Sequence, residues 1–225
     1  ALTTFQQNLD LYRGLPDTEL QQATCLFSTG ATLDDMGRYE EALTAHQDAL
    51  DLYQQVDGTQ EEQALCLLST GDTLRRVGRG RYEEALTAYQ DALDLYRTLP
   101  GTQENQADCL ANIGITLGEM GRYEEALTTF QQALDAYRTL PGTQKDQADC
   151  LANIGTALRE MGRYEEALTA YQDALDLYRT LPGTEPQQAK CLNSIGDTLD
   201  DMGRYEEALT TFQQNLDLYR GLPDT

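Results

Sequence analysis

A seven-residue phrase, RYEEALT, occurs five times in this sequence without change, and it limits the possible folds more than any other feature. Its copies are spaced by 43, 41, 41 and 41 residues, since they begin at Arg38, Arg81, Arg122, Arg163 and Arg204. Self-similarity at a fixed period of this size is typical of a solenoid, in which one small unit repeats and packs mainly against its neighbours. The sequence therefore predicts a stack of near-identical units.

The phrase opens a longer stretch, from Arg81 to Arg97, that has the periodicity of an amphipathic helix. Its large apolar residues follow one another at steps of 4, 3, 4 and 3, which places them on one side of a helix: Tyr82, Leu86, Tyr89, Leu93 and Tyr96. Small residues beside them, Ala85 and Ala92, allow another helix to come close. We call this the outer helix of the unit.

A turn and a second, inner helix follow. Pro100 cannot continue a helix, and the glycine after it suits the positive φ of a turn. A threonine then stands at the predicted N-cap in every unit, at Thr18, Thr59, Thr102, Thr143 and Thr184. Glu62, three residues after Thr59, predicts a capping box.

The inner helix also has one apolar side at helical spacing, made in one unit by Ala107, Leu110, Ile113, Gly114, Leu117 and Met120. Gly121 ends it as a left-handed C-cap residue, and the next copy of RYEEALT begins at once. Each unit is therefore predicted to be an antiparallel helical hairpin.

Taken from end to end, the sequence predicts one continuous repeat array over residues 1–225. Its units are residues 38–80, 81–121, 122–162 and 163–203, with partial units over 1–37 and 204–225. Residues 1–14 are expected to be the end of an outer helix whose RYEE start is missing. Thr18 to Met36 are expected to form the first complete inner helix.

The first and last 18 residues are identical, because ALTTFQQNLDLYRGLPDT spans both residues 1–18 and residues 208–225. Neither end has the polar capping segment that usually closes a solenoid. We therefore expect a window from a longer array or filament with a superperiod of 207 residues. An expression fragment or a recent gene duplication, with ends that coincide by chance, is the alternative.

The chain is strongly acidic, with a net charge of −22. Such a charge repels phosphate, so nucleic acids and anionic membrane surfaces are not expected partners. The sequence has no apolar run long enough to insert into a membrane. The acids are spread over all units, which is typical of a solvated outer face.

The sequence carries no motif of a catalytic or nucleotide-binding site, and we expect neither an enzyme nor a cofactor. Adjacent acids such as Glu83 and Glu84 point about 100° apart on a helix, so they do not converge on a substrate. Asp34-Asp35 and Asp200-Asp201 provide too few oxygen ligands for a good Ca²⁺ site.

One cysteine recurs at the same helical position in each unit: Cys25, Cys66, Cys109, Cys150 and Cys191. Helices of stacked units lie roughly 8–10 Å apart, which is too far for disulfides between equivalent positions. A lone histidine, His46, takes the place of a Tyr or Phe, so no Cys/His metal site is expected. Unpaired thiols slightly favour the cytoplasm over an extracellular fibre, and localisation stays open.

The residues from Leu110 to Ala133 resemble the tetratricopeptide repeat. Its pattern is carried here by Leu110, Ile113, Gly114, Leu117, Gly121, Tyr123, Ala126, Phe130 and Ala133. The 41-residue unit is longer than usual for that family and is similar to the repeats of kinesin light chains. A leucine stands where the family pattern has its first large aromatic residue. The resemblance covers the whole chain and implies an all-α, right-handed superhelical solenoid of antiparallel helix-turn-helix repeats.

The resemblance also implies a concave groove, lined by the inner helices, that holds a peptide or protein. The residues that match groove positions are Ser28, Asp34, Asp35, Asp72, Arg75, Arg76, Asn112, Ile115, Glu119, Asn153, Thr156, Arg159, Glu160, Ser194, Asp197, Asp200 and Asp201. These positions also differ most between units, as expected either of a ligand surface or of free drift at exposed sites. Their many acids favour a basic or polar partner.

Three functions remain open. The first is a non-enzymatic scaffold whose units or chains stack end to end, with itself as partner. The second is an adaptor that binds a protein or peptide in the groove. The third is a surface fibre with sugars on threonines such as Thr128 and Thr129, which would be O-linked because the sequence has no N-x-[ST] acceptor.

Overall fold

The computed structural model describes residues 7, 11, 12, 15 and 18–220, and every regular element in this part of the chain is helical. The chain divides into two compact units, Ala1–Met120 and Gly121–Thr225. The helix end predicted over residues 1–14 falls mostly outside the described residues. That the whole chain forms one continuous array stays a prediction.

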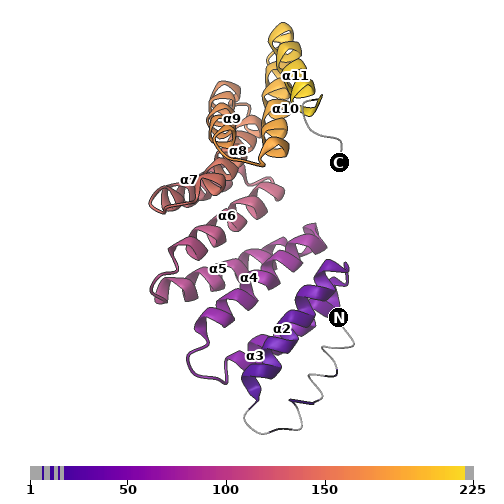
Figure 1. Ribbon diagram of the computed structural model, residues 1–225, viewed down its shortest axis with the longest axis vertical. Helices are drawn as coiled ribbons and strands as arrows, with labels where there is room; N and C mark the ends of the chain where they lie inside the picture. The colour runs from indigo at the N-terminus through magenta and orange to yellow at the C-terminus, as the bar shows by residue number, and fades with distance from the viewer. Residues whose placement is uncertain (1–6, 8–10, 13–14, 16–17, 221–225) are drawn as a thin grey trace. The chain divides into compact units, whose positions relative to one another are not determined.

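The first compact unit contains α2 (Glu19–Asp35), α3 (Tyr39–Tyr53), α4 (Gln60–Val77), α5 (Tyr82–Thr98) and α6 (Gln103–Glu119). The two inserted residues, Arg79 and Gly80, form a single 3-10 turn together with Arg81, η1 (Arg79–Arg81), before α5. Consecutive helices pack against each other along the chain, so that the ribbon turns back at every connection (Figure 1). The predicted helical hairpins are confirmed here.

The second compact unit contains α7 (Tyr123–Arg138), α8 (Gln144–Glu160), α9 (Tyr164–Arg179), α10 (Glu185–Asp201) and α11 (Tyr205–Arg220). Its consecutive helices also pack in sequence. Pro186 lies in the first turn of α10, where the missing N–H costs nothing. Gly121, which precedes α7, has a φ of +76°, as expected of the residue that ends an inner helix.

The outer helix α5 packs against the inner helices on both sides of it, α4 and α6. Leu93 and Tyr96 of α5 share one buried cluster with Ala64 of α4 and Cys109 of α6. The alanine predicted to allow a close approach, Ala92, is fully buried in that cluster. An outer helix is therefore complete only when a second inner helix covers it.

Glycines in the inner helices let an aromatic ring of the outer helix lie against the backbone. A Cβ added at Gly71 would stand 2.6 Å from the Tyr89 ring, and one at Gly155 would stand 2.7 Å from the Tyr171 ring. These distances are shorter than carbon contacts allow, so the position must be glycine unless the ring moves. The close approach predicted from the glycine in this helix is confirmed.

The capping box predicted at Thr59 and Glu62 is wrong. Thr59 is the N-cap residue of α4, but its side chain makes no capping bond. Its hydroxyl instead donates to the carbonyl oxygens of Tyr53, at 2.5 Å, and Val56, at 2.9 Å. The Thr59 backbone, with φ −102° and ψ 23°, lies outside the extended region that a capping side chain needs.

This contact recurs at the start of each inner helix. The threonine hydroxyl donates to a tyrosine carbonyl six residues earlier, at 2.6 Å from Thr102 to Tyr96 and at 2.7 Å from Thr143 to Tyr137. A glutamine four residues later, such as Gln106, donates to the same threonine and the same carbonyl. The turn between two helices is thus closed by side chains that satisfy the last carbonyls of the outer helix.

Candidate functional site

The predicted groove residues lie on the inner helices, and we call the face that they form within each compact unit the inner-helix surface. In the first compact unit α4 touches both α2 and α6, and in the second α8 touches α10. Side chains from successive hairpins therefore meet on this surface. Whether it lines a concave groove stays a prediction.

Two ion pairs join successive inner helices in the first compact unit. Arg76 of α4 binds Asp34 of α2, and Arg75 of α4 binds Glu119 of α6 at 3.0 Å. Between them, Asp72 accepts a hydrogen bond of 2.6 Å from the Tyr89 hydroxyl. Burial raises the pKa of Asp72, and the bond from Tyr89 and the charges of both arginines oppose that rise.

The second compact unit repeats the arrangement with different residues. Arg159 of α8 binds Asp201 of α10 at 2.8 Å, and the charge of Asp197 also acts on it. Thr156 accepts a bond of 3.1 Å from the Tyr171 hydroxyl, with Ser194 as a further partner of that hydroxyl. Glu160 accepts a long bond of 3.4 Å from Tyr123.

Several of the predicted residues take no part in these pairs, among them Asn112, Ile115 and Asn153. Asn112 and Ile115 lie half-buried on α6, and Asn153 lies half-buried on α8. The three arginines of the set, by contrast, each already hold a carboxylate. This surface therefore offers hydrogen-bonding groups to a partner more readily than unpaired cations.

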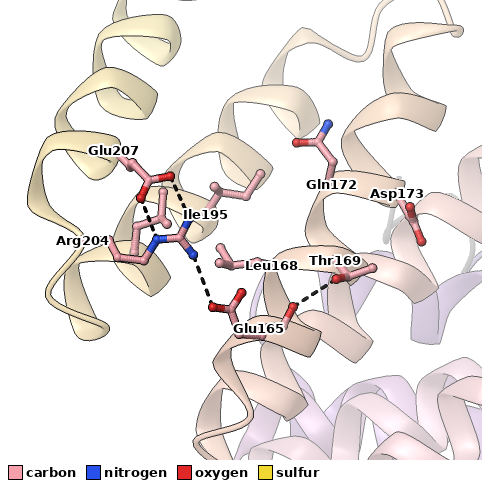
Figure 2. Close-up of a pocket in the computed structure, with 9 residues that line it drawn as sticks. Glu165, Leu168, Thr169, Gln172, Asp173, Ile195, Arg204 and Glu207 are labelled. Carbon is pink, nitrogen blue, oxygen red and sulfur yellow. Dashed lines mark hydrogen bonds and ion pairs between the residues drawn. The ribbon is translucent and has the colours of Figure 1, made fainter.

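A shallow pocket lies in the second compact unit, where α9 meets α10 and the start of α11 (Figure 2). We call it the α9–α11 pocket, and its volume is about 410 Å³. Three aliphatic side chains form its apolar part: Leu168 of α9 with Ile195 and Leu199 of α10. The polar residues around them are Glu165, Thr169, Gln172, Asp173, Arg204 and Glu207.

The charged residues of this pocket differ in how far they are already paired. Arg204 makes two bonds of 2.7 Å to Glu207 and one of 3.4 Å to Glu165. Asp173 lies on the side away from Arg204 (Figure 2) and is exposed, with no hydrogen bond or ion pair inside the described ranges. Three carboxylates surround one cation here, so the pocket carries a net negative charge.

Sequence reasoning missed this pocket because it forms among three helices. A signal existed, since Ile195 occupies the position of Thr70 in the earlier repeat. The Arg204–Glu165 pair also has a counterpart there, in a bond of 3.4 Å between Arg81 and Glu40. The two sites thus share the arginine–glutamate pair and differ in one apolar residue, Ile195 against Thr70.

The α11 helix exposes apolar side chains that other repeats bury. Leu216 is 44% exposed and Tyr219 is 51% exposed, whereas their equivalents in α9, Leu175 and Tyr178, are 1% and 2% exposed. Leu209 is also exposed on α11. We call Leu209, Leu216 and Tyr219 the α11 apolar face.

The cysteines and acids do not form a metal site in the described ranges. All five cysteine side chains are buried, and none of them takes part in a disulfide within the described residues. Burial raises the pKa of the Cys66 thiol to about 12 and that of Cys191 to about 11, so both stay protonated near neutral pH. None of the described helices combines the length and the hydropathy that crossing a bilayer requires.

The solved structures most useful for comparison share the fold at low sequence identity. BtubC (BKLC) from P. vanneervenii aligns over 100% of this chain and 92% of its own, with 16% identity and a TM-score of 0.82. A putative kinesin light chain from Podosopora anserina, with nearly identical TPR-like repeats, aligns over 91% and 97%, with 12% identity and a TM-score of 0.73.

Another structural relative is longer than this chain. Aspartyl phosphate phosphatase F from Bacillus subtilis aligns over 90% of this chain but 52% of its own, with 16% identity and a TM-score of 0.80. These likenesses confirm the predicted all-α solenoid fold and carry no activity with them. A search of the curated proteins found none that matches.

The sequence profiles of known families give a more specific result. One tetratricopeptide repeat profile matches residues 1–55, 71–139 and 146–221, and a second matches residues 29–100. These matches cover nearly the whole chain. The helical hairpins and their glycine–aromatic contacts agree with them. The resemblance seen in the sequence is thus confirmed, and the chain belongs to the tetratricopeptide repeat family.

Proposed function

We propose that this chain is a non-enzymatic protein-interaction scaffold that extends head to tail. In such an array the α11 apolar face packs against an inner helix like α2, either in a second copy or in further repeats. The single observation that carries the proposal is the exposure of Leu216 and Tyr219, at a position where the other outer helices are covered.

The occupant of the α11 apolar face is suggested by the interior of the molecule. In α5, the equivalents of those two residues are Leu93 and Tyr96, and they pack against Cys109 of the following inner helix. The α2 helix carries Cys25 at the equivalent position. An α2 helix therefore carries the matching residue, but Cys25 is buried in its own chain, so a docked α11 has to take the place of the identical residues 1–18 of that copy.

The identical ends support the same pairing. Residues 208–225 include most of α11, and they repeat residues 1–18, which lead directly into α2. The segment that precedes α2 at residues 1–18 is thus repeated at residues 208–225, which carry Leu216 and Tyr219 of the α11 apolar face. If residues 208–225 of one copy take the place of the identical residues 1–18 of the next copy, the repeat distance along the array is 207 residues.

Burial of a large apolar side chain contributes roughly 1.5–3 kcal/mol, so one such contact supports weak association that many contacts in series would reinforce. Sedimentation velocity over a wide range of protein concentration tests this. We expect oligomers of increasing size for the chain itself and a monomer for Leu216→Glu combined with Tyr219→Glu.

The matched control for that experiment is Gln214→Glu combined with Gln213→Glu. Both glutamines are exposed, and other outer helices carry an acid at the position of Gln214, for example Asp91. This control adds the same charge to α11 outside the apolar face and is expected to associate like the original chain. Equal association of all three proteins, or none in any of them, would remove the proposal.

An adaptor that holds a peptide on the inner-helix surface is the second candidate. It is favoured by Asn112 and Asn153, which occupy equivalent positions of α6 and α8 and are half-buried there. Replacing both with alanine leaves the ion pairs of that surface intact. The adaptor function predicts that a captured peptide binds this variant about fivefold more weakly for each hydrogen bond of about 1 kcal/mol that it loses, at an unchanged melting temperature. Unchanged binding would exclude it.

A further inference from the structure

We propose that the α9–α11 pocket binds a lysine or arginine side chain from a partner polypeptide. The site lies apart from the inner-helix surface and from the α11 apolar face, so it is independent of stacking. Its partner is defined by chemistry: an exposed basic residue on a chain that approaches the outer helices.

The shape of the pocket suits a long side chain with an apolar stem. Leu168 is half-buried, while Ile195 and Leu199 beneath it are buried, which leaves a narrow aliphatic strip. The methylene groups of lysine and arginine pack on such strips while the charged head stays near water. Three aliphatic residues provide too little apolar surface to enclose a drug-sized molecule, which usually loses most of its exposed surface on binding.

The charges around the strip select the head group. The Arg204 guanidinium is occupied by Glu207 and Glu165, so it has little left to offer an incoming acid. Asp173 has no partner within the described residues, and it is one of the residues that line the pocket. A cationic head that reaches Asp173 gains an ion pair without breaking one.

Comparison between repeats provides natural variants of two positions in this pocket. The counterpart built on α3 and α4 has Leu43, Leu74 and the Arg81–Glu40 pair, but Thr70 replaces the isoleucine. The position of Asp173 is a glutamine, Gln132, in α7. The chain itself thus contains a repeat without the isoleucine, at Thr70, and a repeat without the carboxylate, at Gln132.

The charge of the whole chain favours the same kind of partner. A net charge of −22 raises the local concentration of basic segments near the surface and speeds their encounter. That general attraction has no preferred place, however. The pocket adds a place where one basic side chain finds both an apolar strip and an unpaired carboxylate.

Methyl NMR of the full chain tests the proposal with the capped tripeptide acetyl-Gly-Arg-Gly-amide as the probe. We expect its titration to shift the methyl signals of Leu168, Ile195 and Leu199, and to leave those of Leu43 and Leu74 unchanged. The lysine tripeptide should act similarly. Norleucine in place of arginine keeps the stem but loses the charge, and it should bind at least about threefold more weakly, the effect of one exposed ion pair.

Two variants taken from the chain's own repeats provide the controls. Ile195→Thr introduces the residue of α4, and Asp173→Gln introduces the residue of α7; each should weaken the arginine probe about threefold or more. Added salt should also weaken the binding of the arginine probe to the original chain. Equal shifts at Leu43 and Leu168, an equal response to norleucine, or stronger binding of acetyl-Gly-Glu-Gly-amide would overturn the proposal.

Discussion

At the scale of single residues, the contact between an inner-helix glycine and an outer-helix ring sets how close the two helices of a hairpin lie. A Cβ at Gly71 would overlap the Tyr89 ring, whose hydroxyl is also fixed by Asp72. Two contacts thus hold one ring. His46 differs from Tyr89, because its ring meets Gly30 while its Nδ1 atom is buried without a hydrogen-bond partner among the described residues.

Gly71→Ala is expected to destabilise the chain by about 1–3 kcal/mol, since the methyl group forces a buried ring to move. The matched control is Gly118→Ala, where an added Cβ meets nothing within 4 Å. Alanine there should stabilise α6 by up to about 1 kcal/mol. Urea unfolding followed by circular dichroism measures both, and equal effects of the two changes would contradict the packing account.

His46→Phe is expected to make stability less dependent on pH. Burial lowers the pKa of His46, which is 1% exposed, and the charge of Asp34 partly opposes this. The unfolded chain therefore binds the proton more readily, and stability falls as the pH drops below about 6.5 towards the lower pKa of the folded state. Phenylalanine, which occupies this place as Phe130 in α7, removes that loss.

The measurement for this prediction is the free energy of unfolding at several values between about pH 7 and pH 5, where histidine titrates. The carboxylates contribute to both proteins, so the difference between the two curves isolates His46. We expect the original chain to lose stability more steeply towards acid. Parallel curves would show that the buried histidine does not control this range.

At the scale of elements, each connection from outer to inner helix is closed by a threonine that bonds backward to the outer helix. Thr102 is buried and donates to the carbonyl oxygens of Tyr96 and Leu99. Thr102→Val keeps the shape but leaves both carbonyls without that donor, which should cost about 1–3 kcal/mol. Thr98→Val, at an exposed threonine of the same turn, is the control and should cost much less in the same thermal melt.

The helices and their order could be predicted from the sequence, but several contacts between them could not. The periodicity from Tyr82 to Tyr96 and the glycine at Gly121 are local signals, and they gave the hairpins. The bond from Thr102 to the preceding helix depends on how the chain reverses. The sequence pattern alone therefore predicted that this threonine caps the helix that follows it. The pairs Arg76–Asp34 and Arg159–Asp201 join residues 42 positions apart and depend on the register between hairpins.

At the scale of the whole molecule, the repeats explain both what was predicted and what was missed. A solenoid follows from the period alone, because each hairpin needs a neighbour to bury its apolar side. The α9–α11 pocket does not follow from one unit, since it needs Leu168, Ile195 and Glu207 from three helices. A small change, from Thr70 to Ile195, separates two sites that the repeat pattern makes equivalent.

Ionic strength is expected to act in opposite directions on the two proposed interactions. Copies that each carry a charge of −22 repel one another, so added salt should strengthen association through an apolar face. Light scattering at several salt concentrations checks this. Association that weakens with salt would point to an interface built from opposite charges instead of Leu216 and Tyr219.

The most direct test of stacking is photo-crosslinking from position 219. Tyr219 is replaced by p-benzoylphenylalanine, heavy and light isotopic copies are mixed and irradiated, and crosslinked peptides that join the two isotopes are mapped by mass spectrometry. We predict that position 219 links to α2 of another copy, near Cys25. Links between copies that fall mainly on other helices, or their absence at concentrations where the chain associates, would contradict the account.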